Sequence, residues 1–252
     1  MPFIYYLSTN GVPLDALDIT FPKIEFNDCK SGTGTFDYLI SKLKYPYEKH
    51  TIYTEDNYIL TAFRILPKNQ NFQTKKKSQN KRPVAYFQHG LMDSSDGWIL
   101  NKEHKNVATM LVERGYDVWL GNSRGNKYSN KHLFFTTQDK HYWDFSFVEM
   151  GKYDLTAMFN YILKKTKQEK LVFVGHSQGT LVLFYALSDP KLSAKLQAQI
   201  SKAIVLSPIA ILTGITNKLI TGISNLPEWP MQLIEKSGVQ LMFPSPCSWN
   251  PT

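Results

Sequence analysis

A five-residue segment, Gly175-His176-Ser177-Gln178-Gly179, contains residue types that could carry nucleophilic chemistry. It follows the apolar run LVFV directly and precedes the helical run TLVLFYAL. A G-x-S-x-G turn between a strand and a helix lifts the serine hydroxyl above the sheet, and the helix directs its first amides at the reacting centre. The alternative is a tight turn without chemistry. Because both flanks are correct, we interpret Ser177 as a nucleophile.

A second segment, Gln88-His89-Gly90-Leu91, ends a short apolar run and could supply an oxyanion hole. Such a hole needs one backbone amide from this loop and one from the residue that follows the nucleophile. We therefore predict that the N–H groups of Leu91 and Gln178 stabilise the oxyanion. His89 lies in the same loop, where we expect it to brace the loop rather than act as a base.

The acid and base of a catalytic triad are not evident. A serine esterase needs a histidine to take the hydroxyl proton, and in this chain order the acid and histidine follow the serine. No histidine follows Ser177, and the later carboxylates are Asp189, Glu228 and Glu235. His176 should leave its strand on the face opposite Ser177. The other histidines lie on an early strand or in loops: His50, His104, His132 and His141.

The elements around these segments alternate between strand and helix patterns. We predict strands at residues 50–54, 58–66, 84–89, 117–120, 171–174 and 203–206, and helices at 107–114, 150–165 and 178–188. The first two strands form a hairpin through Glu55-Asp56-Asn57. This alternation predicts an α/β fold with a mostly parallel sheet and helices on both faces.

Three regions are expected along the chain. Residues 1–36 are rich in turn formers and form an irregular N-terminal extension. Residues 37–208 carry the α/β core. Residues 209–252 are hydrophobic but interrupted by eight Gly and Pro residues. They are therefore either the start of a lid or a tail that lacks its packing partners.

Composition excludes several classes of protein. With 252 residues and 42% hydrophobic content the chain can form a core, and no apolar run is long enough for a transmembrane helix. The formal charge is +8, but six basic residues and no acid lie between Pro67 and Pro83. We interpret this segment as a solvated loop and expect no nucleic-acid partner. The sequence shows no metal cluster or nucleotide loop, so we expect no cofactor.

Cys29 and Cys247 form no metal or redox motif and are interpreted as free thiols, although a disulfide stays open. The N-terminus has no basic n-region and only a five-residue apolar run, so it does not predict a signal peptide. A start truncated in the gene would give the same sequence.

Five longer segments resemble the acid lipase family, which contains lysosomal acid lipase and gastric lipase. The resemblance runs from about Asp37 to about Ala210 and is carried by YPYEKHTIYTEDNYILTAFRI, VAYFQHGLMDSSDGWILN, ERGYDVWLGNSRGNKYSNKH, YWDFSFVEMGKYDLTAMFNYIL and EKLVFVGHSQGT. It implies an α/β-hydrolase core with a cap, and hydrolysis of triacylglycerols or steryl esters at a lipid–water interface. Matched by motif, the family's nucleophile falls on Ser177 and its oxyanion donors on Leu91 and Gln178.

The resemblance also implies a lysosomal or secreted setting, which the N-terminus does not show. The family continues beyond the end of this chain, through the strands that supply its acid and histidine. We therefore interpret the sequence as a truncated member that lacks the last strands of the sheet. By itself it is expected to be nearly inactive.

Two further segments have structural interpretations. Gly121-Asn122-Ser123-Arg124-Gly125-Asn126 lacks the pattern of a phosphate-binding loop, and we predict a turn with a buried polar network braced by Arg124. The aromatic residues Tyr142, Trp143, Phe145 and Phe147 are expected to pack beneath a long loop rather than bind lipid.

Two other functions stay open. A non-catalytic lipid-binding or interaction protein would explain the missing histidine, whereas the intact serine turn argues against it. A peptidase or thioesterase would share the turn but not the lipase-like segments.

Overall fold

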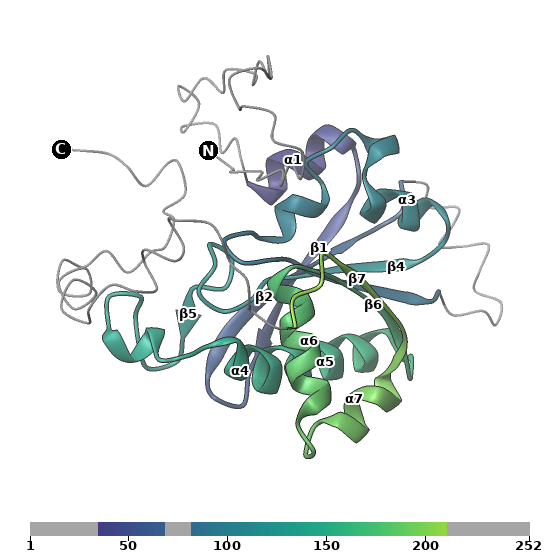
Figure 1. Ribbon diagram of the computed structural model, residues 1–252. Coiled ribbons are helices and arrows are strands. Elements are labelled where there is room, and N and C mark those ends of the chain that lie inside the picture. The colour runs from purple at the N-terminus through teal and green to yellow at the C-terminus, as the bar shows by residue number, and fades with distance from the viewer. Residues whose placement is uncertain (1–34, 69–81, 211–252) are drawn as a thin grey trace, which may run out of the picture.

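The computed structural model describes residues 35–68 and 82–210, and within them seven strands form one sheet (Figure 1). Its order is β1-β2-β4-β3-β6-β7, with the short β5 paired to β2. The strands are β1 (Tyr47–Tyr53), β2 (Tyr58–Ile65), β3 (Val84–Gln88), β4 (Asp117–Gly121), β5 (Lys131–His132), β6 (Leu171–His176) and β7 (Ile200–Leu206). Strands β4, β3, β6 and β7 run parallel, whereas β1, β2 and β5 pair antiparallel. This confirms the predicted mostly parallel sheet.

The hairpin predicted at the start of the core is present. β1 and β2 pair from Tyr47 opposite Ile65 to Tyr53 opposite Ile59. Asn57 closes the turn with φ of 72°, a left-handed conformation that asparagine adopts more readily than most residues. The β-branched and aromatic side chains of both strands favour this pairing.

Helices cover both faces of the sheet (Figure 1). One face carries α1 (Phe36–Leu43), the 3₁₀ turn η3 (Ser95–Trp98) and α3 (Val107–Glu113), and the chain between them includes η4 (Glu103–Lys105). The opposite face carries α4 (Phe147–Glu149), η6 (Met150–Leu155), α5 (Thr156–Thr166), α6 (Gln178–Ser188) and α7 (Ser193–Gln199), preceded by η5 (Lys140–Trp143).

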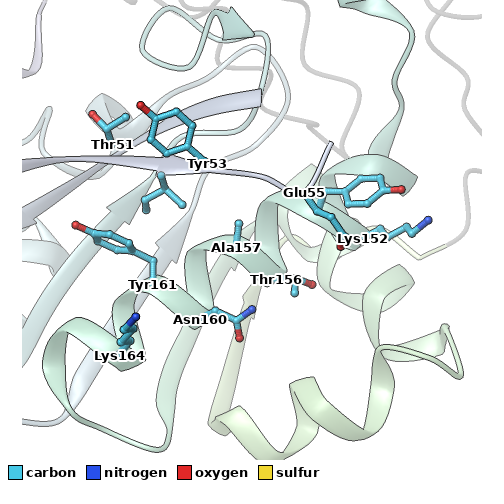
Figure 2. A pocket seen from close by; sticks show the side chains of 11 residues that line it. Thr51, Tyr53, Glu55, Lys152, Thr156, Ala157, Asn160, Tyr161 and Lys164 are labelled. Carbon is cyan, nitrogen blue, oxygen red and sulfur yellow. The ribbon is translucent and has the colours of Figure 1, made fainter. Parts of the chain in front are cut away.

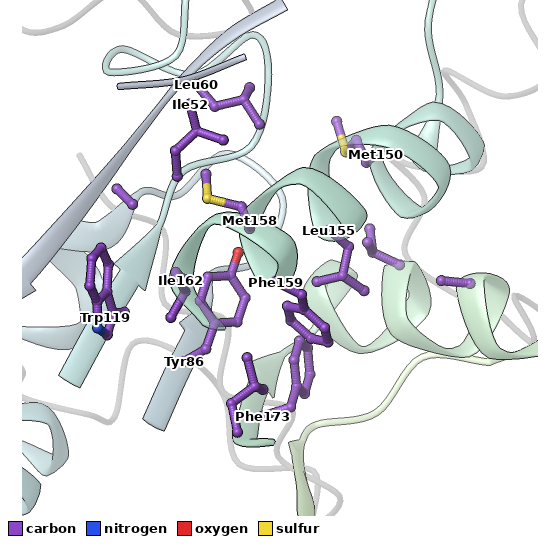
Figure 3. Close-up of a cluster of buried hydrophobic side chains, with 14 of the residues drawn as sticks. Ile52, Leu60, Tyr86, Trp119, Met150, Leu155, Met158, Phe159, Ile162 and Phe173 are labelled. Carbon is purple, nitrogen blue, oxygen red and sulfur yellow. The ribbon is translucent and has the colours of Figure 1, made fainter. Parts of the chain in front are cut away.

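Alternation along β3 divides the hydrophobic core between these two faces. Tyr86 points toward α5, where it contacts Phe159 and Phe173 in the cluster shown in Figure 3. Ala85 and Phe87 belong to the second cluster, on the α1 side. All five residues of β3 are buried, as expected for a parallel strand covered on both faces.

Three helical features were not predicted from the sequence. Helix α1 begins at Phe36, whose ring stacks on Phe63 with centroids 3.9 Å apart, and α7 is an additional short helix. The helix predicted at residues 150–165 is present, but its first turns, η6, are a π-helix. Gly151 lies there against α6, where an added Cβ would be 2.7 Å from the Tyr185 ring and 3.0 Å from the Val182 carbonyl oxygen.

Several expectations lie outside the described residues. These are the extension up to residue 34, most of the basic segment, both cysteines and the region from residue 211 onward. Within the described part, no helix is long and apolar enough to cross a membrane. The predicted packing of the aromatic segment is confirmed, because Tyr142 is fully buried and Trp143, Phe145 and Phe147 pack against the same core.

Candidate active site

Ser177 lies in the turn between β6 and α6, with φ of 50° and ψ of −119°. This conformation is strained for a residue with a side chain and is found mainly where surrounding contacts enforce it. Its backbone N–H donates to the Leu206 carbonyl at 3.0 Å, and its carbonyl accepts from the backbone N–H and the hydroxyl of Thr180 at 2.9 and 2.6 Å. These bonds fix the turn to the end of β7, a contribution of Thr180 that the sequence did not suggest.

Gly179 allows α6 to approach the end of β3. A Cβ added there would be 2.7 Å from the Gln88 carbonyl oxygen and 2.8 Å from that of His89. Both neighbours are backbone atoms, so a side chain would push the helix away. The first amides of α6, including that of Gln178, therefore lie beside the loop that follows β3.

Gly90 brings this loop against the serine. An added Cβ at Gly90 would lie 3.1 Å from the Ser177 Cβ and 3.1 Å from the His176 Nδ1. Leu91 follows with its side chain half exposed, and Met92 has φ of 59°. The structure thus brings Ser177, Gln178 and the Gly90-Leu91 loop together, as the two motifs predict.

His89 is buried beneath the loop and has the expected structural position. Its Nδ1 donates to the Gly90 carbonyl at 2.8 Å, so its Nε2 is the acceptor for the Ser123 backbone N–H at 3.0 Å and the Asn126 side-chain amide at 3.1 Å. Burial lowers the pKa of His89, because its charged form would lose hydration. The neutral ring therefore braces the loop, and neither of its nitrogens hydrogen-bonds to Ser177.

The segment from Gly121 to Asn126 forms the predicted buried polar network. Asn122 accepts from the Ser95 backbone N–H at 3.0 Å and donates to the Thr61 carbonyl at 3.2 Å, while Ser123 accepts from Gln88 Nε2 at 2.8 Å. These bonds tie the loop after β4 to η3, to β2 and to the end of β3.

Arg124 braces the same region through two carboxylates. Its guanidinium is fully buried and forms ion pairs with Asp56 at 2.6 Å and Asp154 at 2.7 Å, and it lies 3.9 Å from the centre of the Tyr58 ring. Burial raises the pKa of Asp154 to about 6, although Arg124 opposes this shift. The sequence indicated the arginine but not its partners.

None of the histidines hydrogen-bonds to the Ser177 hydroxyl, and all six lie in the described ranges. His176 is exposed, 6.5 Å from the Trp98 ring, and His50 hydrogen-bonds to Tyr161 and Glu48 on β1. His104 lies in η4 and His141 in η5, whereas His132 contacts the Asp56 carbonyl. The described residues also contain no cluster of three or more His, Cys, Asp or Glu that could hold a metal ion.

A shallow groove of about 440 Å³ lies elsewhere, between the end of β1 and the η6–α5 segment (Figure 2). Its lining includes three tyrosines and two lysines: Tyr53, Tyr153, Tyr161, Lys152 and Lys164. Neither Ser177 nor either predicted oxyanion residue lines it. The groove is therefore separate from the serine turn.

Comparison with known proteins gives consistent matches. Residues 36–102 match the partial alpha/beta-hydrolase lipase region, and residues 83–246 match the alpha/beta hydrolase fold. Gastric triacylglycerol lipase of Mus musculus is 43% identical over 199 residues, which are 78% of this chain and 48% of that lipase. Lipase member K of Homo sapiens is 41% identical over 189 residues, or 72% of this chain and 46% of lipase K.

Solved structures also match at low identity. An esterase of Pyrococcus furiosus is 22% identical with a TM-score of 0.47, and the match covers 79% of this chain and 66% of the esterase. The chain spans about half the length of the curated lipases it matches.

Proposed function

We propose, from the premise that the chain belongs to the α/β-hydrolase fold family, that it is a serine ester hydrolase acting on neutral lipid esters. The observation that carries this proposal is the strained Ser177 turn packed directly against the Gly90-Leu91 loop. Similarity to a protein named gastric triacylglycerol lipase supports triacylglycerol as the substrate class, and steryl ester is the alternative that the family resemblance implies.

In the proposed reaction the Ser177 Oγ attacks the ester carbonyl carbon while a base takes the hydroxyl proton. The backbone N–H groups of Leu91 and Gln178 stabilise the resulting oxyanion, and each such donor contributes about 3–4 kcal/mol in comparable sites. Collapse of the tetrahedral intermediate breaks the bond to the alcohol, which leaves with a proton. Water then attacks the acyl-serine and releases the acid.

Transfer of the Ser177 hydroxyl proton to a base is the step for which this chain supplies no histidine. All six histidines occupy other positions, and Asp189 lies at the far end of α6, where it caps the next turn. We therefore expect slow acylation of Ser177 in this chain alone. The test is designed around an added base.

The test is acylation of Ser177 by a p-nitrophenyl butyrate substrate with and without imidazole, read by intact-protein mass spectrometry. We expect the butyryl adduct in the wild-type chain to increase at least tenfold with imidazole and to be absent in Ser177→Ala. Circular dichroism of both proteins establishes that they are folded. Because imidazole also cleaves the ester in solution, the adduct on the protein is the readout.

Two outcomes would contradict the proposal. Absence of any adduct in a folded wild-type chain with imidazole would mean that the turn does not activate Ser177, as in a non-catalytic lipid-binding protein. Acylation by thioester or peptide analogues but not by acylglycerols would contradict the substrate class. A third outcome, rapid acylation without imidazole, would instead contradict the expectation that the chain lacks a base, and His132 and His141 would be the first residues to substitute.

A further inference from the structure

Three consecutive apolar side chains project into solvent beyond the end of β5. We call Leu133, Phe134 and Phe135 the aromatic loop; their side chains are 52%, 74% and 36% exposed. Single exposed apolar residues are common on proteins, but a contiguous group of this size usually marks an interaction site.

The aromatic loop lies at the same edge of the sheet as Ser177. β5 pairs with Tyr58 and Ile59 at the start of β2. Because β2 is antiparallel to β4, the start of β2 lies at the carboxyl edge of the parallel strands, where β6 leads into the serine turn (Figure 1). Leu91 and Met92, which follow β3 at this edge, also have exposed apolar side chains.

The backbone of the aromatic loop has its amide donors satisfied internally. Leu133 N–H donates to the Asn57 carbonyl at 3.0 Å, and those of Phe134 and Phe135 donate to His132 Nδ1 at 3.1 and 3.2 Å. The next amide, of Thr136, donates to Asp139 at 2.7 Å. A loop that enters an apolar phase must leave no unpaired amide, whereas a strand-adding protein partner would need free ones.

His132 also fixes the direction of the aromatic rings. Its Nε2 donates to the Asp56 carbonyl at 3.1 Å, so its Nδ1 is the acceptor for the two loop amides. The Phe135 ring stacks on His132 with centroids 4.8 Å apart and an interplanar angle of 19°. The exposed rings are thus held in place before any partner arrives, which reduces the entropic cost of docking.

The charges beside the loop are compatible with a lipid headgroup layer. Lys131 and Lys140 are exposed on its two sides, and His141 is exposed nearby. One acidic residue, Asp139, lies in the turn that follows the aromatic loop. Its carboxylate accepts hydrogen bonds from the backbone N–H and the hydroxyl of Thr136. Basic residues that flank an apolar insertion are favourable at phosphate-bearing surfaces.

We propose that the aromatic loop inserts into the surface of a lipid phase and thereby places the carboxyl edge of the sheet, with Ser177, against that phase. This inference rests on the proposed function, because it assumes that the ester substrate is presented at a lipid–water interface. It specifies which residues make the contact, and it can be tested without hydrolysis.

The test is flotation of the full chain with phosphatidylcholine-stabilised trioleoylglycerol emulsion droplets, at low salt and in 0.5 M NaCl. We expect Phe134→Ser to weaken partitioning roughly tenfold, in line with the loss of one inserted aromatic side chain. Phe134→Leu should partition within about threefold of the wild type. Leu100→Ser is the control, because Leu100 is also an exposed apolar residue, at 61% against 74% for Phe134, but lies outside the loop.

Partitioning of Ser177→Ala should equal that of the wild type, so failure of the catalytic proposal would leave this result unchanged. Equal partitioning of Phe134→Ser and wild type, or complete loss of wild-type binding in 0.5 M NaCl, would overturn insertion of the loop. The wild-type chain could also fail to bind droplets and form dimers that are lost in Phe134→Ser. That result would show that a second copy of the chain covers the loop instead.

Discussion

Ser177 occupies a backbone conformation that costs about 1–3 kcal/mol in other proteins, and its neighbours have the residue types that tolerate this turn. Gly175 and Gly179 flank it, and the closest contacts of Gly179 are backbone carbonyls of β3 and its loop. Thr180 and Leu206 bind the serine backbone on either side. The backbone strain at Ser177 is thus offset by the two flanking glycines and by hydrogen bonds from Thr180 and to Leu206.

Gly179→Ala tests this packing. Alanine would favour the helix by about 1 kcal/mol, but its Cβ would clash with two backbone carbonyls that cannot move away as a side chain can. We expect a net loss of about 1–3 kcal/mol in the free energy of unfolding, measured by urea denaturation, together with loss of Ser177 acylation. Ser188→Ala, at an exposed position of the same helix, is the control. Equal stability of the two variants would contradict the close approach.

His89 predicts how stability depends on pH. Burial lowers its pKa in the folded chain, so the unfolded chain takes up the proton first as the pH falls. The stability that the neutral ring provides is therefore present above about pH 6.5 and is lost as the pH falls toward the lowered pKa.

The measurement is urea unfolding of the wild type and His89→Gln between pH 7.5 and 5. The wild type should be more stable at pH 7.5, and the difference between the two proteins should shrink toward pH 5. Asp154 has the opposite sign, because burial raises its pKa to about 6 and its contribution grows as the pH falls; both proteins retain it. A difference that stays constant with pH would mean that His89 is not a buried neutral ring.

At the scale of elements, β7 differs from the central strands of the sheet in the exposure of its side chains. Among the described residues it pairs only with β6, and most of its side chains are exposed, including Ile204 and Leu206. An edge strand with exposed apolar residues is a template for pairing with another chain. The carbonyl of Leu206, at the end of β7, accepts the hydrogen bond from the Ser177 backbone N–H. Pairing of another chain with β7 would therefore affect the position of the serine turn.

We expect the chain to self-associate through β7. Ile204→Thr retains β-propensity and removes an exposed apolar side chain, so it should weaken association several-fold while changing the free energy of unfolding by less than about 0.5 kcal/mol. Sedimentation equilibrium over a range of concentrations measures this. Phe134→Ser serves as the comparison; if it reduces association and Ile204→Thr does not, the aromatic loop is the contact and the β7 prediction fails.

In the whole molecule, the two core clusters and the polar network stabilise different parts of the sheet. The clusters on either face of the sheet hold β3, β4 and β6 in register, and the network around Arg124 and Asn122 joins the loops at their carboxyl ends. The serine turn, the Gly90 loop and the aromatic loop all lie at that edge. A single edge of the sheet can therefore present both a reactive group and an apolar contact surface.

The sequence by itself determined the β1–β2 hairpin, the central strands and the serine turn, because each has a local pattern: β-branched alternation, buried apolar runs, or a glycine-flanked serine between strand and helix. It also indicated that Arg124 and His89 are structural. Only the tertiary structure decided that Arg124 pairs with Asp56 and Asp154, that Gly179 meets the backbone of β3, and that residues 150–155 wind as a π-helix. These features depend on contacts between positions some 30 to 90 residues apart, such as Gly151 with Tyr185 and Gly179 with Gln88, and such contacts leave no periodic signal in the chain.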